Sequence, residues 1–220
     1  MMGVVGTLFS VLLGFLVASA MERYSEARMH GEQEASQVAG VFRLARGLSD
    51  LDRPRIRELC RGYVDEVINR EWPDMERGQV VNHGWESYQK LWESAVAVVP
   101  ENSRQGNLHQ ALLAALQSVG EHRRARILLS KSGVPVGMWI IVGLGACITM
   151  LLSYVFTSRF PRIQAFMTTL VAAALALNIW LLAAFSHPYS GEIRISPSMF
   201  LLLKEHVLVV PDSPSRYLHD

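Results

Sequence analysis

The stretch LGFLVASAMERYSEAR, residues 13–28, passes from an apolar segment into charged residues at helical spacing, with no turn residue between them. A signal peptide, a membrane anchor and a pore-lining helix are three explanations for such a junction. Ala18-Ser19-Ala20 has the small-x-small form of a cleavage site, which favours a signal peptide. However, no Lys or Arg precedes the apolar segment, and helical periodicity continues through the supposed cleavage point. We therefore expect an uncleaved membrane helix.

The apolar residues of the chain are gathered in three blocks. The 220 residues are 50% hydrophobic with a net charge of +1, so no strongly basic character indicates a nucleic-acid partner. Asp, Glu, Lys and Arg are absent from residues 1–21, 132–158 and 163–191. Each block reaches the ~20 residues with which a helix crosses ~30 Å of hydrocarbon. The sequence predicts an all-α integral membrane protein with transmembrane helices at 1–21, 134–157 and 163–187.

Residues 22–131, between the first two spans, show the periodicity of amphipathic helices. Apolar residues recur at helical spacing from Ile56 to Ile68 and again from Leu108 to Val119, and no alternating strand pattern competes with them. We therefore expect the spans to continue into a helical bundle outside the membrane, with a tail at 188–220.

Basic residues near the spans predict the orientation of the chain. Only Arg159 and Arg162 lie in the hairpin between the second and third spans. On the other side of the membrane the first and second spans are flanked by six basic residues: Arg23, Arg28, Arg123, Arg124, Arg126 and Lys131. The positive-inside rule then places the helical section and the tail in the cytoplasm, with the spans in a bacterial inner membrane. The run at 121–126 could also bind anionic lipid headgroups.

The first predicted span carries two ridges of residues spaced four apart. One is a ridge of small residues that would let neighbouring helices pack closely: Gly6, Ser10, Gly14 and Ala18. The other, one helical step around, is formed by Thr7, Val11 and Phe15. Such a helix suits a ring of identical helices around an axis. It also suits a helix packed inside a monomeric bundle, with Phe15 against lipid or a neighbouring helix.

Residues 14–28 resemble the second membrane helix of the bestrophins, which are anion channels. Phe15, Glu22-Arg23-Tyr24 and Glu26-Ala27-Arg28 match the bacterial bestrophin pattern without a gap. The wider chain resembles the bacterial family called bestrophin-like, through Glu34-Ala35, the Leu-Ala-x-Gly-Leu run at 44–48 and the Pro-aromatic-x-Gly run at 188–191.

This resemblance implies a homopentameric channel for anions such as chloride. Five copies of Thr7, Val11 and Phe15 would form the neck of the pore, where an apolar ring gates by dewetting. Arg23 and Arg28 would lie at the cytoplasmic mouth, where they would concentrate anions. The chain differs from the bestrophins in two respects, because Thr7 is polar and three spans are predicted instead of four.

Other interpretations remain open from the sequence. The chain could be a non-conducting scaffold or sensor, anchored in the bilayer, whose cytoplasmic helices bind a protein partner. Arg28 could serve only to pair with Glu22 or Glu32, one or two helical turns away. An enzyme is not expected, because the spans lack paired acids, Ser/Lys pairs and His ligands. We likewise expect no metal and no cofactor.

Overall fold

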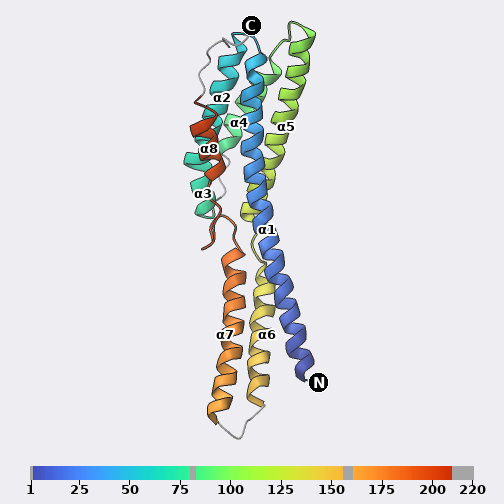
Figure 1. Cartoon of the computed structure of the whole chain (residues 1–220), viewed down its shortest axis with the longest axis vertical. Coiled ribbons are helices and arrows are strands. Elements are labelled where there is room, and N and C mark those ends of the chain that lie inside the picture. Colours follow the sequence, from blue (N-terminus) through green and yellow to red (C-terminus); the bar gives the residue numbers. More distant parts are fainter. Residues whose placement is uncertain (1, 80–82, 156–160, 210–220) are drawn as a thin grey trace, which may run out of the picture. The chain divides into compact units, whose positions relative to one another are not determined.

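The structure, a computed structural model, describes the backbone of residues 2–79, 83–155 and 161–209 and the side chains of 6–79, 83–153 and 161–209. Within these ranges every regular element is a helix, which confirms the all-helical prediction (Figure 1). Residues 156–157 of the predicted second span, Arg159 and the tail beyond 209 lie outside the described residues. The chain divides into two compact units, described separately below.

The apolar unit comprises residues 1–26 and 132–194. It contains the first part of helix α1 (Met2–Leu44), together with α6 (Val136–Val155) and α7 (Pro161–Phe185). All three helices are long and apolar enough to cross a membrane. Pro161 opens α7 at a position where its missing N–H is not needed, and α6 and α7 lie side by side (Figure 1).

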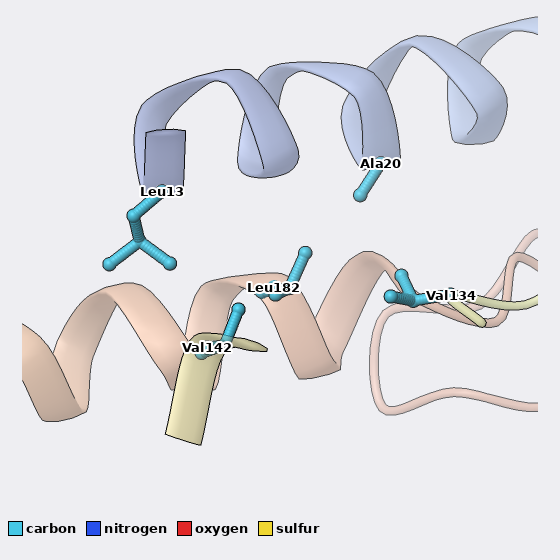
Figure 2. Packing of buried hydrophobic residues seen from close by; sticks show 5 residues of the cluster. All are labelled: Leu13, Ala20, Val134, Val142 and Leu182. Carbon is cyan, nitrogen blue, oxygen red and sulfur yellow. The ribbon is translucent and has the colours of Figure 1, made fainter. Parts of the chain in front are cut away.

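A small cluster of buried residues joins the three helices of the apolar unit. Figure 2 shows Leu13 and Ala20 of α1 pointing toward Leu182 of α7 and Val142 of α6. Most of the remaining apolar surface of these helices is not covered by the described part of the chain. In the most apolar 18-residue segment of α1 only 17% of the residues are buried, and in the corresponding segments of α6 and α7 only 6% are. Lipid or further protein copies must therefore cover this surface.

Gly145 on α6 allows a close approach to α1, because a Cβ there would overlap the ring of Phe9. We expect Gly145→Val to destabilise the protein by about 1–3 kcal/mol, the usual effect of overpacking. Thermal unfolding in detergent measures the change. Gly143→Val is the matched control, since nothing lies within 4 Å of a Cβ at Gly143. Equal effects of the two variants would rule out this packing of Phe9 on α6.

The bundle unit comprises residues 27–131 and 195–220. Besides the second part of α1, its elements are η1 (Ala45–Gly47), α2 (Asp52–Glu66), η2 (Val67–Glu71), α3 (Trp72–Glu76), α4 (His83–Val96), α5 (Ser103–Lys131) and α8 (Ser198–His206). Helix α2 packs against α4, and α4 against α5. Two hydrogen bonds fix the start of α5: the backbone N–H of Gln105 donates to Asn102 Oδ1, and the backbone N–H of Glu101 donates to Gln105 Oε1.

The predicted apolar stripes form the core of this bundle. Of the first stripe, Ile56, Cys60, Tyr63 and Val67 are buried, while Leu59 and Ile68 are half-buried. Of the second, Leu112, Leu116 and Val119 are buried. Residues 38–42 of α1 supply a third side of the core through Val38, Val41 and Phe42. The two stripes therefore identified seven core positions, while the buried residues of α1 and of Trp72–Glu76 lie outside them.

Helix geometry is interrupted between α2 and α3, where η2 is a π-helical turn. Pro73, two residues after the end of η2, has no N–H to donate to a carbonyl of the preceding turn. The wider turn accommodates this loss by adding one residue to the helical repeat. Glu71, the last residue of η2, and Trp72, the first of α3, are both buried.

Candidate pore helix and buried charge network

The face of α1 expected to form a pore neck is the face that α6 and α7 leave uncovered. Val11 precedes the buried Ala20 by nine residues, which at about 100° per residue places the two on opposite sides of the helix. Thr7 and Phe15 lie about 40° to either side of Val11. Thr7 is exposed, and the exposed fractions of Val11 and Phe15 are 52% and 72%. All three are therefore available to lipid or to another copy of the chain.

The ridge of small residues is also largely uncovered within the chain. Ser10, Gly14 and Ala18 are exposed, and Gly6 is half-buried. A Cβ at Gly6 or at Gly14 would meet nothing within 4 Å. The face that α1 uses inside the chain is a different one, formed by Leu13 and Ala20 with flanking Phe9, Leu16 and Val17. Three of the four ridge residues are thus left uncovered by the described part of the chain.

Beside the expected neck, α1 and α6 enclose two shallow apolar grooves. One, of about 390 Å³, is lined by Leu8, Phe9, Leu12, Ile141, Leu144, Gly145 and Ile148. The other, of about 430 Å³, is lined by Leu8, Val11, Leu12, Phe15, Leu16, Met138 and Ile141. Since no charged side chain lines either groove, both suit apolar occupants such as acyl chains or the side chains of another helix.

The two arginines expected at the mouth differ in their surroundings. Arg23 belongs to the apolar unit and is half-buried, twelve residues beyond Val11 and so about 120° around α1 from it. Arg28 belongs to the bundle unit and is exposed, and its Nε lies 2.8 Å from Glu32 Oε1. This is the i,i+4 pair that the sequence allowed as the alternative role of Arg28. Exposed pairs of this kind contribute less than about 1 kcal/mol.

The most concentrated charge in the bundle unit is a buried network of two carboxylates and two guanidinium groups. Arg126 holds Glu34 bidentately, with Nε to Oε2 at 2.7 Å and Nη2 to Oε1 at 3.0 Å. The same Nη2 lies 2.7 Å from Oε1 of Glu71, whose Oε2 accepts from Arg123 Nη2 at 2.9 Å. All four side chains are at most 2% exposed.

Neutral groups complete the coordination of these carboxylates. The Tyr63 hydroxyl donates to Glu34 Oε1 at 2.5 Å, and the backbone N–H of Gly84 donates to Glu71 Oε2 at 2.8 Å. A side chain at Gly84 would overlap the Glu71 carboxylate, so glycine is required there for this approach. The network thus joins α1, α2, η2, α4 and α5 through hydrogen bonds that the low dielectric of the core strengthens.

Protonation states in the network follow from its pairing. Burial alone would raise the pKa of Glu71, but Arg126 and Arg123 outweigh it and hold the pKa below its ordinary value. Burial would lower the pKa of Arg126, whereas Glu34 and Glu71 raise it. Burial, followed by the charge of Glu34, raises the pKa of the Tyr63 hydroxyl, which remains a neutral donor. The two carboxylates and the two guanidinium groups balance in formal charge.

This arrangement corrects the suggestion that the basic run at 121–126 binds lipid headgroups. Two of its three arginines, Arg123 and Arg126, are buried and paired with Glu71 and Glu34. Arg124 is exposed and donates to the Gly120 carbonyl within its own helix. Only a minor part of the run is therefore available to a membrane surface.

Sequence reasoning missed this network, although a signal for it exists. The stripe of buried residues on α5, Leu112, Leu116 and Val119, continues at the same spacing into Arg123 and Arg126. A charged residue on an apolar stripe is rarely buried without a partner.

Among the described residues no group of three or more His, Cys, Asp or Glu side chains could hold a metal ion.

Comparison with known proteins gives one match. A family model described as Bestrophin-like domain matches residues 1–200. No curated protein and no solved structure matches the chain.

Proposed function

The chain belongs to the bestrophin-like family, and on that premise we propose that it is a membrane protein that assembles as a homopentamer and passes anions such as chloride. The observation that carries this proposal is the exposure of Val11 and Phe15, which lie on the side of α1 away from its buried residues Leu13 and Ala20. A helix that lines a pore must keep one face free of its own chain. In the ring, Thr7, Val11 and Phe15 form the neck.

The rest of α1 supports this assembly. The ridge of Gly6, Ser10, Gly14 and Ala18 is adjacent to the neck face and open, so it is the surface on which the α1 of a neighbouring copy packs closely. The bundle unit lies in the cytoplasm of a bacterial cell, as the positive-inside rule favours. Arg23 then lies near the cytoplasmic mouth and attracts anions.

The proposed neck is tested by Phe15→Ala. An apolar ring resists an ion because it offers no partner to replace lost water, so a smaller ring lowers the barrier. Chloride efflux from reconstituted vesicles should rise, about tenfold for each ~1.4 kcal/mol removed from the barrier. Leu177→Ala is the control, because Leu177 is an exposed apolar residue of α7, a helix that takes no part in the proposed neck. Unchanged efflux in Phe15→Ala would refute the neck assignment.

The mass of the protein in nanodiscs distinguishes failure of the neck from failure of the assembly. Five copies with no response at Phe15 would place the constriction elsewhere. A monomer or a dimer would exclude a pore on a symmetry axis and leave the second candidate, a non-conducting scaffold or sensor. That candidate is favoured by the exposed Trp85 on α4, an aromatic residue of the kind enriched at protein interfaces.

A further inference from the structure

Two histidines of the bundle unit contact each other through their Nδ1 atoms. His30 on α1 and His122 on α5 have their Nδ1 atoms 2.9 Å apart, with ring centroids at 5.2 Å and planes tilted by 41°. Both side chains are half-buried. An imidazole nitrogen donates when it carries hydrogen and accepts when it does not, so the contact needs exactly one hydrogen between the two Nδ1 atoms.

This requirement limits how many protons the pair can hold. When both rings are neutral, one Nδ1–H donates to the other Nδ1. One added proton keeps this bond and makes it charge-assisted, since the charged ring donates to the neutral ring. A second added proton puts hydrogen on both Nδ1 atoms and two positive charges on rings in contact. The contact therefore accepts one added proton and excludes two.

The surroundings do not remove this limit. Burial first and His30 second lower the pKa of His122, while the nearby carboxylates of Glu34 on α1 and Glu121 on α5 raise it by less. Glu34 is already held by Arg126 and Tyr63, so its carboxylate cannot turn to accept a hydrogen bond from a doubly protonated pair without breaking the buried network. Glu121 is exposed and pairs with Gln117 on the solvent side of α5.

We propose that His30 and His122 form a proton-operated contact between α1 and α5, which is closed at neutral pH and opens locally when both imidazoles are protonated. The contact concerns the bundle unit alone and does not depend on the proposed conduction of anions. The pKa of His122 is about 6.5 in the unfolded chain and lower in the folded protein. At any pH between these two values the unfolded chain binds more protons than the folded protein does. The stability from this contact is therefore full above about pH 6.5 and is lost as the pH falls toward the folded pKa.

Hydrogen–deuterium exchange of the full-length protein in nanodiscs tests the proposal without any substitution. After correction for intrinsic exchange rates, peptides containing His30 and His122 should lose protection between pH 8 and pH 5. The loss should be about tenfold for each pH unit by which the pKa of His122 in the folded protein lies below its pKa in the unfolded chain. Peptides around Leu91 in the core of α4 should not. The buffer contains EDTA, because two imidazoles at this spacing could also bind a transition metal. Glu71 does not interfere, since its pKa lies below the ordinary glutamate value and hence below this range.

Asparagine variants show whether the two histidines act as one unit. The amide Nδ2 of asparagine occupies a place similar to that of histidine Nδ1 but does not titrate near neutral pH. His30→Asn, His122→Asn and the double variant should each abolish the pH-dependent loss of protection to the same extent, since a single histidine has no partner to repel. His109→Gln is the control, because His109 also lies on α5 but bonds the Ala95 carbonyl. It should leave the pH dependence intact.

Two results would overturn the proposal. One is protection around His30 and His122 that stays constant from pH 8 to pH 5 in the unsubstituted protein. The other is a pair of single variants whose effects sum in the double variant, which would mean that the two histidines titrate independently. If a variant fails to fold, the exchange of the unsubstituted protein still decides. Absence of chloride flux, by contrast, would bear only on the proposed channel.

Discussion

Glu34→Ala is expected to destabilise the protein by about 3–5 kcal/mol, as is typical when one partner of a buried ion pair is removed. The variant leaves Arg126 buried with Glu71 as its remaining carboxylate, while Glu71 must also neutralise Arg123. It also leaves the Tyr63 hydroxyl without its acceptor. Denaturant unfolding followed by tryptophan fluorescence measures the loss.

Glu32→Ala provides the matched control for this prediction. Glu32 lies on the same helix two residues earlier, and its pair with Arg28 is exposed to solvent, so its loss should change the stability by less than about 1 kcal/mol. The double variant Glu34→Met/Arg126→Met should be more stable than Glu34→Ala, because it leaves the neutral pair of Glu71 and Arg123. Equal losses in Glu32→Ala and Glu34→Ala would contradict the buried network.

Trp72→Ala is the second substitution with a large expected effect, also about 3–5 kcal/mol. Trp72 is buried between the network and the C-terminal helix α8. Its Nε1 donates to the Ile195 carbonyl at 3.2 Å, and its ring meets Phe200 edge-on with centroids 5.8 Å apart. The Arg126 guanidinium lies 5.4 Å from the ring on another side. Loss of the indole should both open a cavity and release residues 195–209 from the bundle.

Limited proteolysis separates the release of α8 from a general loss of stability. At a temperature where Trp72→Ala is still folded, cleavage near Ile195 should become faster, while cleavage within α4 should not. Trp72→Phe keeps an aromatic ring against Phe200 but removes the hydrogen bond and part of the buried ring system, so we expect a loss smaller than that of Trp72→Ala. Faster cleavage at both places in Trp72→Ala would show that the indole supports the whole bundle rather than α8 in particular.

The sequence predicted where the helices lie better than it predicted which residues of different helices contact one another. The junction between apolar and charged residues at 13–28 indicated an unbroken helix, and α1 does continue from Met2 to Leu44. The stripes at 56–68 and 108–119 identified core positions because apolar periodicity reports directly which face a helix buries. In the first span this signal is weak, since residues are apolar on all sides, and only the structure shows that Leu13 and Ala20 form the inner face.

The charge network could not be predicted in the same way. Glu34 and Arg126 are 92 residues apart, and Glu71 and Arg123 are 52 apart, so their pairing depends on how α1, η2 and α5 pack together. In the sequence alone, each of these residues has the appearance of a solvent-exposed charge or of a basic residue that fixes the orientation of the chain in the membrane. The π-helical turn η2 could not be predicted either. It adds one residue to the helical turn, whereas apolar periodicity indicates a helix only when the repeat is constant.

That extra residue is absorbed within the turn itself. The i→i+5 bonds of η2 let its five residues carry the chain about as far around the helix axis as four residues of a regular α-helix do. Deleting one residue from Val67–Glu71 would therefore restore a regular helix and leave Trp72, Asp74 and Met75 on their buried side. An extra residue in a regular helix, with no wide turn to absorb it, would instead rotate everything after it by about 100°. The segment is thus a place where the chain accommodates a change in length without losing its core.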